Sequence, residues 1–522
     1  MKNEKKGTSK IEVDKIKEVL SNIGKKIVIV LKNLAKMIAK FFKELSKIKV
    51  GKFNGAHIFT SVVVILLLFI FIGGGKKEVA YPVIFNNADG DLYLMDNSIK
   101  TEDDAIKLGN GESTSNIVYA NTTDRYVLFQ KSEALYLYDA KEKEETTKIV
   151  ANIADYAFTE DDKYIVALNE DDELLVYDYK ETERIEKDVA DIVAMSEDKI
   201  LYEKESILYV RSINPKKDDR LKVTEDYDAY VRFSEDGKNI IYINGERELH
   251  IFNINKDKDE KIAKNVSSYY CDDKSCEKLF YVESDDTKTV YYYDGKDAQS
   301  MVKDIYSINA YDVSKKQLVF TKLEDSEYVL YYQKVGNDPV VIEDGLTSLR
   351  TVKLFKGKDI YYINADNEVK YIKINGSKLG ELKTIGEDVT GYLHLYKDGY
   401  AFVGNVKNTK GTLYLAKNGK AKEIDEDVNS SLITVSNKGN AVYYLKDYKT
   451  TGDLYVTKGG KGKEIEKDVY NYEYVRDDLI YLIKDYSISK SRGDLYRYTN
   501  KSVLIAEDIT RIASVPTHFE LD

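Results

Sequence analysis

Beyond residue 80 the chain alternates short apolar segments with polar turns, and the same pattern returns along its length. An apolar strand that ends in Tyr is followed by a polar turn and by a second strand that opens with Leu-Tyr or a close substitute. An apolar anchor in the second strand recurs at a mean spacing of about 40 residues, which is typical of a repeat architecture. The eleven anchors are Leu92, Leu135, Leu174, Leu208, Leu249, Val290, Leu330, Val369, Leu413, Leu454 and Leu495.

Each unit has room for four short strands. In residues 437–475 the pattern predicts strands at 441–445, 453–457, 464–467 and 471–475, separated by polar or Gly-containing turns. Four antiparallel strands in about 40 residues match one blade of a β-propeller, whereas leucine-rich and helical repeats need spacings that are absent here. The sequence therefore predicts an all-β fold, a β-propeller of about eleven four-stranded blades.

The phase of the repeat predicts how the chain ends meet. The first unit starts on what is the second strand of later units, at 83–85, while residues 511–515 supply a surplus first strand. Together they would complete one blade and leave no open sheet edge. Because a ring usually holds roughly four to eight blades, the eleven units predict two rings, residues 80–300 and 301–516, followed by a tail at 517–522.

The region before the repeats has the features of a membrane anchor. Residues 56–75 carry no charge, and residues 62–72 are apolar without interruption, which is the length and character of a transmembrane helix. A buried core helix is the alternative, but the Lys-rich flanks favour a membrane span. Residues 1–55 hold 15 Lys against five acidic residues, so they are expected in the cytoplasm, with the C-terminal domain extracellular.

Residues 1–55 also carry an apolar stripe at helical spacing. The stripe consists of Ile16, Leu20, Ile23, Ile27, Val30, Leu34, Met37 and Phe41, and Lys residues occupy the other faces. A two-stranded coiled coil would need a narrower stripe than this one, which Val28, Ile29 and Leu31 widen. An amphipathic helix on the inner leaflet is therefore favoured, with the lipid bilayer as its partner.

Charge separates the two regions further. Residues 1–55 have a net charge of +10 and the whole chain −11, which leaves −21 for residues 56–522. A region this acidic repels nucleic acid, so no nucleic-acid partner is expected for it. The chain has 44 Tyr and no Trp, a composition that suits many half-exposed strands.

One turn carries a family resemblance. Residues 231–242, Val-Arg-Phe-Ser-Glu-Asp-Gly-Lys-Asn-Ile-Ile-Tyr, resemble the Phe-Ser-Pro-Asp-Gly-Lys signature of TolB-type propeller repeats, with Glu235 in place of Pro. Residues 157–166 form a looser copy. The resemblance implies a propeller used for protein or ligand contact. The C-terminal Gly-Asp-Leu-Tyr units also resemble uncharacterised membrane-anchored propellers of Gram-positive bacteria, which imply no activity.

Few residues suit catalysis or metal binding. The four histidines are isolated, and His394 is expected to share one strand face with Tyr392 and Tyr396 as a packing or surface residue. No nucleophile elbow or zinc-protease motif is present. Cys271 and Cys276 flank one turn, where a disulfide is expected outside the cell, and structural zinc, the alternative, needs two further ligands.

No cofactor is expected from the sequence, and calcium is the alternative considered. The acidic turns at 87–91 and 160–162 offer oxygen ligands, but the first lacks the downstream Glu of an EF-hand. The aspartates of four recurring Asp-Val pairs, Asp188, Asp388, Asp427 and Asp468, are expected to have structural roles. No residue is assigned as catalytic, cofactor-binding or metal-binding.

Three functions remain open. The first is a membrane-anchored extracellular module, not an enzyme, that presents Tyr and acidic side chains to an unknown protein, peptide or cell-wall polymer. The second is a calcium-dependent propeller enzyme of the lactonase or lyase type, with acidic groups at the central channel. The third is a transmembrane sensor, although residues 1–55 contain no recognisable signalling domain.

Overall fold

The computed structural model describes residues 49–50, 53–54, 82–96, 105–110, 114–123, 125–141, 146–217, 219–228, 230–271 and 274–516. The chain divides into two compact units, Met1–Glu78 and Val79–Asp522. In the first unit, β1 (Lys49–Val50) pairs with β2 (Phe53–Asn54). Apart from the four residues of β1 and β2, the segments 1–55 and 56–75, for which helices are predicted, lie outside the described residues. Among the residues that are described, no helix is long and apolar enough to cross a bilayer.

The described part of the second unit is built from antiparallel sheets, with one 3-10 turn, η2 (Ile254–Lys256). We number the sheets 1 to 11 in chain order, and the first six have four strands each. Their strands are β45 (Arg511–Ser514), β3 (Val83–Asn86), β4 (Asp91–Met95) and β5 (Ile106–Asn110) in sheet 1; β6 (Thr114–Tyr119), β7 (Tyr126–Lys131), β8 (Ala134–Asp139) and β9 (Thr146–Val150) in sheet 2; β10 (Ile153–Phe158), β11 (Ile165–Asn169), β12 (Leu174–Tyr177) and β13 (Thr182–Glu186) in sheet 3; β14 (Asp191–Met195), β15 (Lys199–Lys204), β16 (Ile207–Ser212) and β17 (Leu221–Thr224) in sheet 4; β18 (Arg232–Phe233), β19 (Asn239–Ile243), β20 (Leu249–Asn253) and β21 (Lys258–Ala263) in sheet 5; and β22 (Val266–Tyr270), β23 (Leu279–Ser284), β24 (Lys288–Tyr293) and β25 (Ala298–Val302) in sheet 6.

The remaining sheets follow the same plan with two variations. Sheet 7 contains β26 (Ser307–Asp312), β27 (Gln317–Glu324), β28 (Glu327–Lys334) and β29 (Val340–Leu346), and sheet 8 contains β30 (Leu349–Phe355), β31 (Asp359–Asn364), β32 (Val369–Asn375) and β34 (Lys383–Gly386), with the short β33 (Lys378–Leu379) also on β32. Sheets 9 to 11 form one ten-stranded run of β35 (His394–Tyr396), β36 (Gly399–Lys407), β37 (Lys410–Lys417), β38 (Lys420–Val435), β39 (Val442–Lys446), β40 (Gly452–Thr457), β41 (Lys463–Arg476), β42 (Leu479–Ser487), β43 (Arg492–Tyr498) and β44 (Ser502–Ile509). They are joined because β38 and β41 are long, and each is the fourth strand of one sheet and the first of the next.

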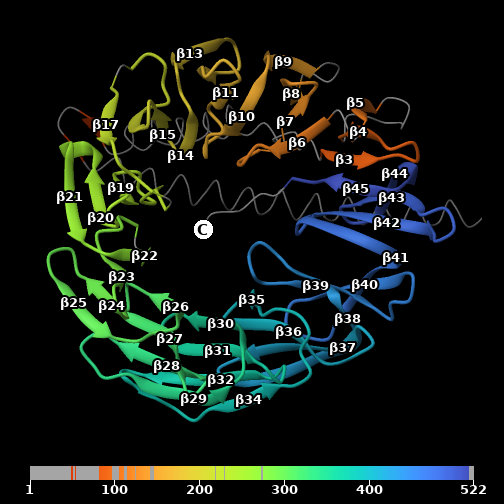
Figure 1. Ribbon diagram of the computed structural model, residues 1–522. Helices are drawn as coiled ribbons and strands as arrows, with labels where there is room; N and C mark the ends of the chain where they lie inside the picture. Colours follow the sequence, from red (N-terminus) through yellow and green to blue (C-terminus); the bar gives the residue numbers. More distant parts are fainter. Residues whose placement is uncertain are drawn as a thin grey trace, which may run out of the picture. The chain divides into compact units, whose positions relative to one another are not determined.

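The core consists of apolar layers between consecutive sheets. Each buried cluster draws its residues from two neighbouring sheets, and together the clusters link sheet 1 to sheet 2 and so on to sheet 11. A further cluster joins sheet 11 to sheet 1, where Phe85 packs with Tyr481 and Leu495. Figure 1 shows the sheets following one another around a ring, with β6 and β26 toward its middle and β9 and β29 at its outside.

The ring is closed by the two ends of the repeat region. β45 pairs with β3, which confirms that a surplus C-terminal strand completes the first sheet. The N–H of Thr510 donates to the carbonyl of Asn86 at 2.9 Å, and Arg511 Nε donates to Asn86 Oδ1 at 3.0 Å. Backbone and side-chain bonds therefore tie the last repeat to the first.

The structure has one ring of sheets where the sequence predicts two. The expected boundary after residue 300 falls inside β25. Phe280 of sheet 6 and Phe320 of sheet 7 share one buried cluster across it, as neighbouring sheets do elsewhere. The described residues thus form a single closed series of eleven sheets, because every sheet covers the apolar face of the next and the last covers the first.

The apolar anchors of the repeat occupy equivalent positions. All eleven lie in the third strand of a sheet; Leu92 is 4 % exposed and the other ten are 0 % exposed. At most of these anchors the pairing between the third and the fourth strand shifts register, as between Leu454 and Tyr455 of β40. This confirms that the period marks one four-stranded sheet per repeat.

The turn that resembles TolB-type repeats is a closed hydrogen-bonded unit. Ser234 Oγ donates to Asp236 at 2.8 Å and accepts the N–H of Asn239 at 3.0 Å. The N–H of Gly237 donates to the carbonyl of Ser234, and its φ of +63° is one that glycine adopts without strain. These residues fix the hairpin between the first two strands of sheet 5, which is a structural task.

Candidate functional site

The histidines have no catalytic arrangement in the described residues. His250 Nδ1 lies 2.6 Å from Asp259 and its ring stacks on Tyr242, so it belongs to a surface polar contact. Burial lowers the pKa of His394. Of the two tyrosines expected on the strand face of His394, Tyr396 lies two residues further along β35 and shares that face, whereas Tyr392 precedes the strand and is 73 % exposed.

Cys271 and Cys276 form a disulfide, with Cα atoms 5.5 Å apart. Both residues are buried in the layer between sheets 5 and 6. Arg232 Nη2 donates to the carbonyl of Cys271 at 3.2 Å and contacts both sulfur atoms. The disulfide therefore closes the hairpin between β22 and β23 of sheet 6, and the contacts of Arg232 hold this hairpin against the start of sheet 5.

The acidic turns considered for calcium have other partners. The carboxylate of Asp162 accepts the N–H groups of Asn121 and Thr122, at 2.7 and 2.6 Å, which joins sheet 3 to sheet 2. Asn87 Oδ1 accepts the N–H groups of Asp89 and Asp91 within its own turn. Within the described ranges no group of three or more His, Cys, Asp or Glu residues could hold a metal ion.

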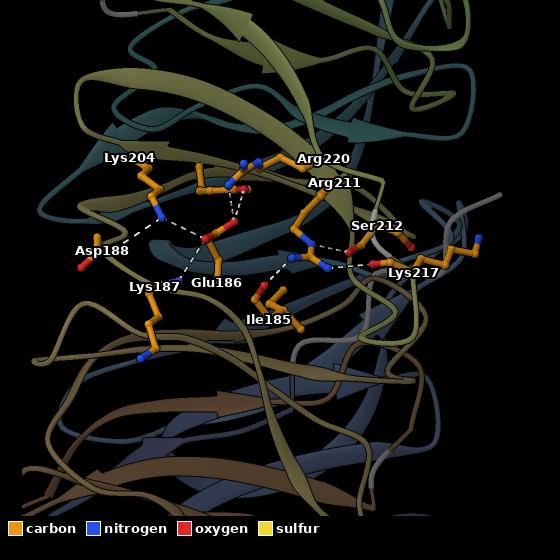
Figure 2. A network of polar contacts seen from close by, with 10 residues as sticks. Ile185, Glu186, Lys187, Asp188, Lys204, Arg211, Ser212, Lys217 and Arg220 are labelled. Carbon is orange, nitrogen blue, oxygen red and sulfur yellow. Dashed lines mark hydrogen bonds and ion pairs between the residues drawn. The ribbon is translucent and has the colours of Figure 1, made fainter.

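A dense polar network lies between sheets 3 and 4 (Figure 2). Glu186 of β13 accepts hydrogen bonds from Lys204 at 3.0 Å, from Tyr202 at 3.0 Å and from Arg220 at 3.1 Å. Nearby, the buried guanidinium of Arg211 donates to the main-chain carbonyls of Ile185, Lys217 and Ser212. The network satisfies charges that the packing of the two sheets removes from water.

The same contact recurs at equivalent positions in other sheets. Glu466 of β41 accepts from Lys484 of β42 at 2.8 Å, and Asp425 of β38 accepts from Lys446 of β39 at 2.6 Å. In each case an acid on a fourth strand meets a lysine on the second strand of the next sheet. A contact repeated at fixed phase joins neighbouring sheets, so the Glu186 network is structural and not a candidate site.

In each four-stranded sheet the connection to the next sheet and the turn between strands two and three lie at one end, and the other two turns lie at the opposite end. The two edges of the ring therefore differ. We call the end that holds the connection to the next sheet the connection edge. Three tyrosines at this edge are exposed, each one or two residues before the first strand of its sheet. They are Tyr230 before β18, Tyr306 before β26 and Tyr392 before β35, exposed by 67, 50 and 73 %, and we call them the tyrosine rim.

Two recesses open at the same edge. Tyr306 and Tyr328, with ring centroids 4.9 Å apart, line a recess of about 190 Å³ between sheets 7 and 8. The hydrogen bond with Tyr306 raises the pKa of Tyr328. An acidic recess of about 370 Å³ beside sheet 4 is lined by Glu203, Ser206, Glu225, Asp226, Tyr227 and Asp228.

The sequence predicts Tyr and acidic side chains at the rims of the propeller but does not distinguish these three tyrosines from the others. The 44 Tyr residues include many that are buried, such as Tyr202, Tyr362 and Tyr481. The signal that distinguishes the rim is position, since each of its tyrosines lies in a connection between sheets rather than inside a strand.

Comparisons with known proteins give little further information. No family model and no curated protein matches the chain. Two solved structures show a weak likeness. For the tricorn protease the TM-score is 0.27 at 12 % identity, over 83 % of this chain and 58 % of that one; for Kluyvelomyces marxianus Hsv2 the TM-score is 0.28 at 10 % identity, over 52 % and 97 %. A likeness at this level does not support a fold assignment. The assignment of a β-propeller fold therefore rests on the closed series of four-stranded sheets.

Proposed function

We propose that this chain is a membrane-anchored interaction module at the cell surface and binds a protein, peptide or wall polymer through the tyrosine rim. The observation that carries the proposal is the exposure of Tyr230, Tyr306 and Tyr392 at one edge of a fold whose other large hydrophobic side chains, among the described residues, are mostly buried. Tyrosine is enriched in binding interfaces because it combines a large apolar ring with a hydroxyl that hydrogen-bonds.

The acidic recess extends the proposed binding surface. It lies at the connection edge with the tyrosine rim and is lined by Glu203, Glu225, Asp226 and Asp228. Tyr227 donates to Glu203, and burial followed by this hydrogen bond raises the pKa of Tyr227. A partner with basic groups beside an apolar patch would complement both features.

Membrane anchoring is supported by the sequence. Residues 56–75 are uncharged and follow a segment with 15 Lys and five acidic residues, which favours a cytoplasmic N-terminus. The Ser234–Asn239 turn supports a relation to TolB-type repeats, which are used for contact with other molecules. A binding role needs no catalytic group, and the proposal includes no reaction.

The proposal is tested on intact cells with a cell-impermeant cross-linker and the full-length chain. We expect the double variant Tyr306→Ser, Tyr392→Ser to lose at least about tenfold of the cross-linked partner, because exposed aromatic anchors dominate interface energy. The matched control is Val503→Ser, Leu504→Ser, which removes exposed apolar side chains from β44. The proposal would be refuted if both variants cross-linked equal amounts of partner, or if the cell-impermeant reagent cross-linked no partner to the wild-type chain.

A further inference from the structure

A further recess opens at the opposite edge of the ring, where the turns between strands one and two and between strands three and four lie. Its volume is about 520 Å³. Three turns line it: residues 396–399 between β35 and β36, residues 415–422 around the β37–β38 turn, and Gly459 between β40 and β41. We call it the lysine recess, because four of its residues are Lys397, Lys417, Lys420 and Lys422.

Positive charge in the lysine recess exceeds negative charge. Lys397 Nζ donates to the carbonyl of Lys458 at 2.9 Å, and Lys422 Nζ donates to the carbonyl of Gly459 at 2.8 Å. In the described part of the chain neither ammonium has a carboxylate in ion-pair contact. The single acid of the recess, Asp398, is already held by Lys417 at 3.0 Å and by Lys356, from outside the recess, at 3.1 Å.

A buried hydroxyl completes the recess. Tyr396 is 6 % exposed, and its hydroxyl has no hydrogen-bond partner among the described residues. A buried polar atom without a partner has a free-energy cost, which a ligand that accepts its hydrogen bond would remove. A Cβ at Gly459 would lie 3.2 Å from this hydroxyl and 3.7 Å from Lys397 Nζ, so glycine leaves the space beside both groups open.

We propose that the lysine recess binds a phosphate group, with Lys397 and Lys422 as its charge partners and the Tyr396 hydroxyl as a neutral donor. Each ammonium has three N–H donors and gives one to a carbonyl, so donors remain for a ligand. Lysine binds phosphate as a point charge, and a phosphate group has enough acceptor oxygens for two ammonium groups and one hydroxyl. The surplus of cations contrasts with the net charge of −11 of the whole chain.

The test is calorimetric titration of the full-length chain with inorganic phosphate. We expect saturable binding that Tyr396→Phe weakens by about threefold to tenfold, the effect of one neutral hydrogen bond, and that Lys422→Met weakens by about tenfold or more. Lys463→Met is the matched control, since it removes one exposed charge from β41 without lining the recess. All three variants keep the 15 Lys of residues 1–55, so a difference in phosphate affinity between them reports binding at the lysine recess.

Tyr396→Phe is informative because it should leave folding intact. It removes a hydroxyl that bonds to no described group, so we expect an unchanged or slightly raised Tm alongside weaker phosphate binding. Equal phosphate binding by wild type, Tyr396→Phe and Lys422→Met would overturn the proposal, as would binding of acetate as tight as that of phosphate. Sedimentation with phosphatidylglycerol vesicles then identifies the source, with the vesicle binding expected from residues 1–75 as the baseline. Vesicle binding that inorganic phosphate or Lys422→Met lowers, and Lys463→Met does not, indicates a lipid phosphate, whereas vesicle binding that neither of them changes indicates a soluble one.

Discussion

At the scale of the residue, four aspartates set the path of the chain between sheets. Asp188, Asp388, Asp427 and Asp468 have φ between +49° and +56°, and each precedes a valine that is 0 % exposed. The N–H of Val389 then donates to the carbonyl of Asn367, in the turn between strands two and three, at 2.9 Å. The left-handed residue thus turns the chain so that the next side chain enters the core.

Asp388 permits a direct test of this role because its side chain is exposed. Left-handed backbone suits Asn and Asp but strains β-branched residues. We expect Asp388→Val to lower the free energy of unfolding by about 1–2 kcal/mol and Asp388→Asn to leave it nearly unchanged, measured by urea denaturation. Equal stability of the two variants would show that the conformation of this residue is unimportant.

The sequence identified these aspartates as structural from their fixed phase, but it could not identify Tyr396. The lysine recess draws on turns that lie about 20 and 40 residues apart in sequence, close to half and one repeat. Within each turn, Lys-Asp-Gly, Lys-Asn-Gly or Gly-Gly resembles an ordinary solvated hairpin. Only the packing of consecutive sheets brings these turns to one place.

At the scale of the element, the contacts between acids and lysines join one sheet to the next. Burial would raise the pKa of Glu186, but the hydrogen bonds from Lys204, Tyr202 and the Lys187 N–H lower it more, and the pKa ends below its ordinary value of 4.5. A carboxyl group with a lowered folded pKa adds stability above its unfolded pKa. That stability is lost as the pH falls from about 4.5 through the folded pKa.

Glu186→Gln should therefore lower stability near neutral pH and have little effect in acid. We expect a loss of about 2 kcal/mol at pH 7, because Lys204 and Arg220 lose their charged acceptor, and a loss that shrinks below pH 4. Unfolding in urea at several pH values measures both effects. Glu181→Gln serves as the control because Glu181 is exposed and its side chain has no partner in the described structure. A difference in unfolding free energy between wild type and Glu186→Gln that stays constant with pH would contradict the stabilising role of the ionised Glu186 carboxylate.

Element boundaries were less predictable than element identity. In residues 437–475 the sequence predicted separate strands at 464–467 and 471–475, and the structure has one strand, β41. β41 pairs with β40 through Glu464 and Glu466 and with β42 through Tyr472 and Tyr474. Asp468, with its positive φ, marks the change of partner. Pairing of one continuous strand with two sheets is a tertiary property that the local pattern of residues does not contain.

At the scale of the whole molecule, the period predicted the number of sheets but not the number of rings. The anchors count eleven units, and each anchor lies in the core of its sheet. Closure depends instead on the angle between neighbouring sheets, which many small differences in side-chain volume set together. The usual size of propeller rings favoured two rings, and the pairing of β45 with β3 gives one.

Closure makes a prediction that distinguishes one ring from two. Deletion of residues 511–522 removes β45, leaves β3 with an unpaired edge and opens the apolar layer that contains Phe85 and Tyr481. In a single ring this deletion should increase amide hydrogen exchange both in β3 and β4 and in β42 and β43, and lower the Tm by several degrees. Deletion of residues 517–522 alone leaves β45 in place and is the matched control. In two separately closed rings, exchange would rise in the second ring while β3 and β4 stayed protected. Protection of β3 and β4 in the longer deletion would therefore reject the single ring, because those strands would have a partner other than β45.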